Sequence, residues 1–124
     1  MKRLVLISLA ALGIVGATGV SAATEAPKNQ CLLTRDLRNH TVGDAHTLYF
    51  NVNGRDVYAV TTSGACLAAA TSSDPIVMVD RGSNGRICSA IDWDISVGGA
   101  RCIVSGMKKL TPEEAKALPK GVRP

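Results

Sequence analysis

The sequence predicts a small, mainly β domain: a twisted antiparallel sheet or barrel of OB-like order, with a short C-terminal helix and two disulfides. Three observations lead to this class. Asn53-Gly54 joins two runs of alternating residues, which is the strongest short-range signal of a β-hairpin. The chain has four cysteines, an even number that suits two bridges in a small exported domain. Thr111, Pro112 and Glu114 have the spacing of a helix start with a capping box.

The N-terminal end has the pattern of a secretory signal peptide over residues 1–22. Lys2 and Arg3 precede an apolar run, and small residues end the segment. We expect cleavage after Ala22, with Ala23 as the alternative, and no membrane span in the mature chain. The remainder divides into a flexible lead over 23–30, a single β-rich domain over 31–118 and a tail over 119–124.

Composition excludes several classes of protein. The 124 residues are 46% apolar and 19% charged, which does not fit a disordered, collagenous or coiled-coil chain. Basic residues number 14 and acidic residues 10, and removal of Lys2 and Arg3 lowers the net charge from +4 to +2. So small a positive surplus does not suggest binding to nucleic acid. The signal segment and the cysteines together predict a periplasmic or secreted protein.

Cys31, Cys66, Cys88 and Cys102 are expected to form two structural disulfides. Four cysteines allow three pairings, and we favour Cys31–Cys66 with Cys88–Cys102, with the other two left open. No two cysteines have the Cys-x-x-Cys spacing of a redox or zinc motif. We therefore predict no metal and no cofactor.

The hairpin is the best-defined local element. Its strands cover residues 47–52 and 55–60. A two-residue type I′ turn would fix their register, with Phe50 opposite Val57 on the core side and Tyr49 opposite Tyr58 on the more exposed side.

The other elements follow from alternation, turn residues and helix caps. In chain order they are a strand over 31–39, helical turns over 66–70, a strand over 75–79, a turn over 81–85, a strand over 86–97, a turn at 98–99, a strand over 101–106 and a helix over 112–118. Pro75 suits the start of a strand, and Pro119 stops the helix. The order resembles that of an OB-fold.

A longer pattern connects the cysteines with the residues around them. Its positions are Cys31, Asp44, Thr47-Leu48, Tyr58, Cys66, Ile87-Cys88, Asp92, Gly98-Gly99, Cys102 and Thr111-Pro112-Glu113-Glu114. In these positions the chain resembles a family of small exported proteobacterial proteins of unknown function. The match covers nearly all of the mature chain and is looser after Cys66, where the family tends to have a glycine. The resemblance implies an exported, disulfide-bearing domain and no particular activity.

Two groups of polar residues are candidates for chemistry. His40, Asp44 and His46 lie close together and would suit zinc or copper, but such a site needs three or four convergent ligands. A polar loop before the hairpin is the simpler interpretation. Asp92 and Asp94 would point the same way from one strand, as paired carboxylates of a hydrolase do. So small a chain barely builds a catalytic cleft, and we predict no enzyme.

Tyr49, Tyr58 and Trp93 are the candidate binding residues, because aromatic side chains dominate interaction surfaces. They also fill small cores, and the core is the favoured role of Trp93. We predict an exported, non-enzymatic module that binds an unknown protein or glycan partner in the cell envelope. The alternative is a protein inhibitor of a cell-wall hydrolase, which would insert the loop 81–86 into the enzyme. A small hydrolase that uses the two aspartates comes third.

Overall fold

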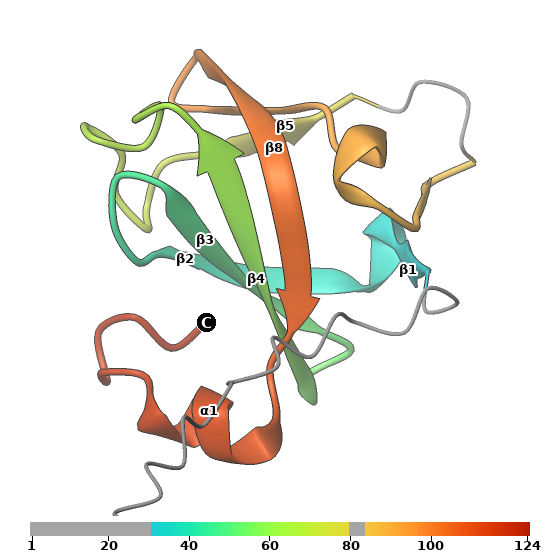
Figure 1. Cartoon of the computed structure of the whole chain (residues 1–124), viewed down its shortest axis with the longest axis vertical. Helices are drawn as coiled ribbons and strands as arrows, with labels where there is room; N and C mark the ends of the chain where they lie inside the picture. The colour runs from blue at the N-terminus through green and yellow to red at the C-terminus, as the bar shows by residue number, and fades with distance from the viewer. Residues whose placement is uncertain (1–30, 80–83) are drawn as a thin grey trace, which may run out of the picture.

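The computed structural model describes residues 31–79 and 84–124 of the chain (Figure 1). The predicted signal peptide, residues 1–22, and the predicted lead, residues 23–30, lie outside the described residues, as do residues 81–83 of the predicted turn. No helix in the two described ranges is long and apolar enough to cross a membrane.

A curled, six-stranded antiparallel sheet forms the domain, and the mainly β class predicted from the sequence is confirmed. In sheet order the strands are β2 (Leu37–Val42), β3 (Thr47–Val52), β4 (Asp56–Ser63), β8 (Ala100–Lys109), β7 (Ile95–Val97) and β5 (Ile76–Met78). A small second sheet pairs β1 (Leu32–Leu33) with β6 (Arg86–Ile87). Figure 1 shows β4 and β8 as the long central pair. β5 is an edge strand additional to the five strands of an OB-like order.

The β3–β4 hairpin forms at Asn53-Gly54, but its loop is one residue longer than predicted. The φ angles are 55° at Asn53 and 71° at Gly54, as a type I′ turn requires. Arg55 donates its N–H to the Val52 carbonyl at 3.2 Å and then bulges out, so that Val52 pairs with Asp56. A bulge of this kind places two residues of one strand opposite one of the other.

The extra residue exchanges the two faces of β4. Phe50 pairs with Tyr58 and not with Val57, and Tyr49 pairs with Ala59. A register shift of one residue moves each side chain to the opposite face of the sheet. Tyr58 therefore lies in the core, and the prediction that it pairs with Tyr49 on the exposed side is wrong.

Short 3-10 helices interrupt the two long strands predicted at 31–39 and 86–97. The first interruption is η1 (Thr34–Asp36), between β1 and β2, and the second is η2 (Ala90–Asp92), between β6 and β7. Ser89 and Asp92 form a capping box around η2, which turns the chain out of the strand. Residues 66–70 form hydrogen-bonded turns and no helix.

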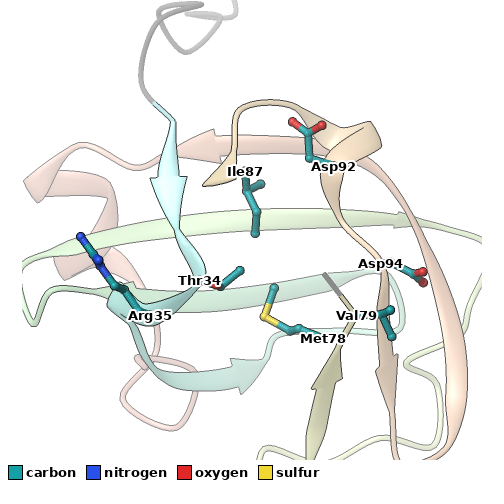
Figure 2. A pocket seen from close by; sticks show the side chains of 7 residues that line it. All are labelled: Thr34, Arg35, Met78, Val79, Ile87, Asp92 and Asp94. Carbon is teal, nitrogen blue, oxygen red and sulfur yellow. The ribbon is translucent and has the colours of Figure 1, made fainter. Parts of the chain in front are cut away.

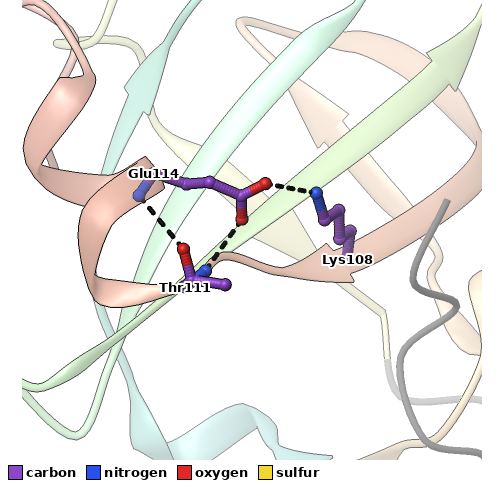
Figure 3. A network of polar contacts seen from close by, with 3 residues as sticks. All are labelled: Lys108, Thr111 and Glu114. Carbon is purple, nitrogen blue, oxygen red and sulfur yellow. Dashed lines mark hydrogen bonds and ion pairs between the residues drawn. The ribbon is translucent and has the colours of Figure 1, made fainter. Parts of the chain in front are cut away.

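The C-terminal elements follow the prediction more closely. Gly98 and Gly99 turn β7 into β8 with φ angles of 56° and 86°. Helix α1 (Pro112–Ala117) begins at Thr111, whose hydroxyl accepts a hydrogen bond from the Glu114 N–H at 3.2 Å. The Glu114 carboxylate accepts from the Thr111 N–H at 2.8 Å and pairs with Lys108 Nζ at 2.7 Å (Figure 3). This network fixes α1 to the end of β8.

The core lies on the concave, inner face of the curled sheet. Its apolar residues are Leu32, Leu48, Phe50, Val52, Tyr58, Val60, Leu67, Ile87, Trp93, Ile95, Val97, Cys102 and Val104. They come from both sheets and from the turns after β4 and at η2. The small β1–β6 sheet thus closes one side of the core through Leu32 and Ile87.

Two disulfides are present, as predicted, but their pairing is Cys31–Cys88 and Cys66–Cys102. The favoured pairing of neighbours along the chain is therefore wrong. The reason is strand pairing: β1 lies antiparallel to β6, which brings residue 31 beside residue 88. In the same way the β4–β8 ladder brings the turn after β4 against residue 102. The two bridges interleave along the sequence.

Candidate functional site

Two of the three aromatic residues predicted to bind a partner lie in the core. Tyr58 and Trp93 are each 5% exposed. The Trp93 ring centre lies 5.3 Å from that of Phe50, and its Nε1 donates a hydrogen bond to the Met107 sulfur at 3.4 Å. The core role favoured for Trp93 is thus confirmed. Burial raises the pKa of the Tyr58 phenol, so this group stays protonated at neutral pH.

Tyr49 is half-buried on the outer face of β3. Its ring packs on Gly43, where a Cβ atom would lie 2.5 Å from Tyr49 Cε2. On the same face Asn51 has a buried side-chain oxygen without a hydrogen-bond partner among the described residues. The chain after α1 also reaches this side of the sheet, because the Thr41 hydroxyl donates to the Val122 carbonyl. Tyr49 is therefore a packed side chain and not an open aromatic platform.

The exposed surface that stands out is apolar and not aromatic. Val77 and Val79 are each 54% exposed, Ile103 is 68% exposed and Ile91 is 89% exposed. Cys102 points into the core, so its neighbour Ile103 on β8 points outward. Val77 and Val79 point outward in the same way from β5 and the residue that follows it. We call Val77, Val79 and Ile103 the outer patch.

Sequence reasoning missed the outer patch because residues 76–79 are apolar at every position. Such a run has no alternation that assigns one face to solvent. A signal was nevertheless present. Continuous apolar strands are typical of sheets covered on both faces, and a chain of this size has too few elements to cover both faces of an edge strand.

An ion pair lies among the side chains of the outer patch. The Asp94 carbonyl accepts the Val79 N–H at 2.9 Å. The next residue, Ile95, is buried in the core, so Asp94 lies on the outer face, between β5 and β8. Its carboxylate lies 3.4 Å from Arg101 Nε. The Arg101 side chain is 67% exposed and that of Asp94 is 13% exposed. An arginine beside exposed apolar groups is a combination enriched at protein interfaces.

A cavity of about 320 Å³ lies where β5 faces η1 and β6. Its lining residues are Thr34, Arg35, Met78, Val79, Ile87, Asp92 and Asp94. Figure 2 shows Ile87 and Met78 directed into the cavity from opposite sides, with the Arg35 side chain directed away from it. We call this cavity the seam pocket, because it lies between the two edge regions of the curled sheet.

The other end of this seam is closed by hydrogen bonds. The His40 ring is hydrogen-bonded through Nε2 to the Asp74 carbonyl at 3.1 Å, and the Val42 N–H donates to the Ser72 hydroxyl at 3.0 Å. The loop before β5 is thereby tied to β2.

The two carboxylates of the hydrolase hypothesis do not share a strand face. Asp92 belongs to η2, where it accepts the N–H groups of Cys88 and Ser89 at 2.8 Å each, and these bonds lower its pKa. Asp94 instead faces Arg101. Figure 2 shows the two carboxylates directed differently. The prediction that both point the same way is wrong, because η2 takes Asp92 out of the strand.

The two histidines lie apart and contact different backbone carbonyls. His40 contacts Asp74 as described, and His46 Nδ1 is hydrogen-bonded to the Gly64 carbonyl at 2.9 Å. The Asp44 carboxylate accepts the His46 N–H at 2.7 Å, which lowers the pKa of Asp44. Across residues 31–79 and 84–124, no three His, Cys, Asp or Glu side chains are grouped to hold a metal ion.

Comparison of the chain with protein-family models, with curated proteins and with solved structures finds no match. The resemblance to an exported family therefore stays a prediction. The outer patch, the edge of β5 and the seam pocket are the features that bear on function.

Proposed function

We propose that the protein is an exported, non-enzymatic module that binds a partner protein through the outer patch. The observation that carries the proposal is that Val77, Val79 and Ile103, each more than half exposed, lie on the outer face of β5 and β8, the two strands that flank β7. Exposed apolar side chains gathered on one face are costly in water and mark interaction sites in soluble proteins. The Asp94–Arg101 ion pair supplies polar contacts at the same place.

The composition of the exposed surface favours a protein over a glycan as the partner. Of the four aromatic residues, Phe50, Tyr58 and Trp93 are buried and Tyr49 is half-buried. A flat, open aromatic ring for stacking on a sugar is therefore not offered by the described surface. Branched aliphatic side chains beside an arginine suit the apolar centre of a protein interface.

The two disulfides support a location outside the reducing cytoplasm. Together with the predicted signal peptide they favour the periplasm or the extracellular space. The inhibitor alternative gains no specific support, because residues 81–83 of its loop lie outside the described residues. The capping role of Asp92 and the ion pair of Asp94 explain both carboxylates without a catalytic role.

Site-specific photo-crosslinking in the exporting host tests the proposal. A benzoylphenylalanine residue at position 77 or 103 is expected to give a discrete crosslinked protein, and one at Arg55, on the distant hairpin loop, is not. Ile103→Lys should abolish the crosslink from position 77 without unfolding the domain, because its side chain is already exposed. The same products from all three positions, or none from 77 and 103, would contradict the proposal.

A further inference from the structure

We propose that the partner contributes an extended polypeptide segment, which adds a strand to the free edge of β5 and places one apolar side chain in the seam pocket. This inference rests on the proposed function and specifies how the partner binds. It also predicts what the segment contains: an apolar residue for the pocket and a nearby lysine or arginine.

The first step is the direction of the backbone groups of β5. Val79 donates its N–H to Asp94, and Pro75 accepts the Gly98 N–H at 3.3 Å. In an antiparallel pair, alternate residues direct their N–H and C=O toward the same neighbour. The backbone groups of residues 75, 77 and 79 therefore point toward β7. Those of Ile76 and Met78 point away from it. β5 pairs with β7 alone and is the last strand of the sheet, so no described strand pairs with the backbone groups of Ile76 and Met78 on the other edge.

These backbone groups, unpaired among the described strands, favour a polypeptide over a small molecule. Ile76 and Met78, two positions apart in the strand, each present one N–H donor and one C=O acceptor along the same edge. An extended backbone repeats its own donors and acceptors with this spacing, which is the basis of strand addition in peptide recognition. Edge strands are often protected by charge, by proline or by being short. β5 is short, with Pro75 directly before it, but its own residues Ile76–Met78 are all apolar.

The seam pocket suits one side chain of such a segment. Met78 contributes both an outward backbone edge and a side chain to the cavity, and Ile87 covers the opposite side (Figure 2). Side chains of an added strand alternate between the faces of the sheet. Every second residue of the segment would therefore point toward the pocket, and those between would extend the outer patch beyond Val77 and Val79.

The charge of Asp92 at the rim of the seam pocket favours a basic residue in the bound segment, next to the apolar one. Asp92 lines the pocket, and the groups that donate to its carboxylate, the N–H groups of Cys88 and Ser89 and the Ser89 hydroxyl, are neutral. No described lysine or arginine forms an ion pair with this carboxylate, and the side chain of Arg35, which lines the same pocket, is directed away (Figure 2). A partner lysine or arginine beside the apolar residue would supply such a cation.

The experiment uses the full mature domain and a phage-displayed library of random 12-residue peptides. Enriched peptides are expected to combine an aliphatic or aromatic residue with a nearby basic one. Met78→Pro is the diagnostic variant, because it removes the outward N–H and leaves the bonds from 75, 77 and 79 to β7. Binding of a selected synthetic peptide should fall at least tenfold, and Met78→Leu, the matched control, should bind as the unchanged domain does.

A second measurement leaves the domain unaltered, in case Met78→Pro disturbs β5. N-methylation of the selected peptide, one residue at a time, should abolish binding at alternate positions only. Amide hydrogen exchange at Met78 should slow on binding, with no change at Val77, which already faces β7.

Each of the other outcomes would contradict a specific part of the two proposals. Peptides that bind Met78→Pro as well as they bind the unchanged domain, with no alternation in the N-methyl series, would overturn strand addition. If the same peptides failed to bind Ile103→Lys, the proposed function would still stand. Self-association that Met78→Pro abolishes would replace the partner by a second copy of the chain. Failure to enrich any peptide, together with no crosslink from positions 77 and 103, would overturn both proposals.

Discussion

Deletion of Arg55 tests the register of the central hairpin. In the structure Arg55 is an exposed, bulged residue between the Asn53-Gly54 turn and Asp56, which pairs with Val52. Its removal leaves a two-residue turn of the type that Asn-Gly favours, and the Val52–Asp56 pair is retained. We therefore expect the deletion variant to fold with the same residues in its core.

The change in the free energy of unfolding distinguishes this register from the one that the sequence alone suggests. If Arg55 were instead paired opposite Val52, Val57 and Ala59 would face the core, and the deletion would turn both of them out of it. Burial of a valine is worth about 2 kcal/mol and that of an alanine about 1 kcal/mol. Their loss would lower the free energy of unfolding by about 3 kcal/mol, a large part of a typical stability of about 5–15 kcal/mol. In the observed register the deletion should change the free energy of unfolding by less than about 1 kcal/mol.

Urea unfolding followed by Trp93 fluorescence measures this change, because Trp93 packs on Phe50 beside the affected strand. Arg55→Ala is the control that removes the side chain and keeps the loop length, and it should behave like the unchanged domain. A deletion variant that is unfolded, or that loses about 3 kcal/mol or more, would refute the bulged register. Nuclear Overhauser contacts between the Phe50 and Tyr58 rings in the unchanged domain, retained in the variant, would support it directly.

Three further predictions concern stability. Joint replacement of Cys66 and Cys102 by alanine should lower the free energy of unfolding in urea by about 3–4 kcal/mol, the loop-closure value for a separation of 36 residues; a loss under about 1 kcal/mol would contradict it. The pKa of Asp92 is lowered from 3.8 in the folded protein. Its carboxylate therefore stabilises the fold above that pH, and this stabilisation is lost as the pH falls through the folded pKa. Asp92→Asn should flatten the acid limb of a curve of unfolding free energy against pH, and an unchanged limb would show that other groups dominate. Thr111→Ala removes the cap of α1 and should cost about 1 kcal/mol, measured by the same urea titration, and should increase amide exchange at Glu114; unaltered exchange would show that α1 does not depend on its cap.

The sequence predicted those elements whose cause is local. Both turns, at Asn53-Gly54 and Gly98-Gly99, and the cap at Thr111 depend on backbone preferences of a few adjacent residues, and each occurs where expected. The face of Tyr58 could not be predicted, because one bulged residue decides it and nothing in the composition of the loop distinguishes two residues from three.

The site was less predictable than the fold. The aromatic residues were natural candidates for binding, yet a core with so few aromatics uses Tyr58 and Trp93 for packing. The outer patch depends on how much of the sheet is left uncovered, which is a property of the assembled domain. The seam pocket likewise joins η1, β5 and β6, which are far apart in the chain.

The interleaved disulfides have a consequence for how the protein is made. If the chain is exported N-terminus first, as proposed, it presents Cys31 and then Cys66 to the oxidising side before Cys88 appears. The first bond available to it, Cys31–Cys66, is absent from the final structure. Any such bond must be broken again by attack of a thiolate, an exchange that takes seconds to hours and that isomerases accelerate. The yield of correctly paired protein in a host therefore depends on the supply of disulfide isomerase as well as on the oxidant. A chain that kept the early bond would lack the β1–β6 pair, which forms one side of the seam pocket.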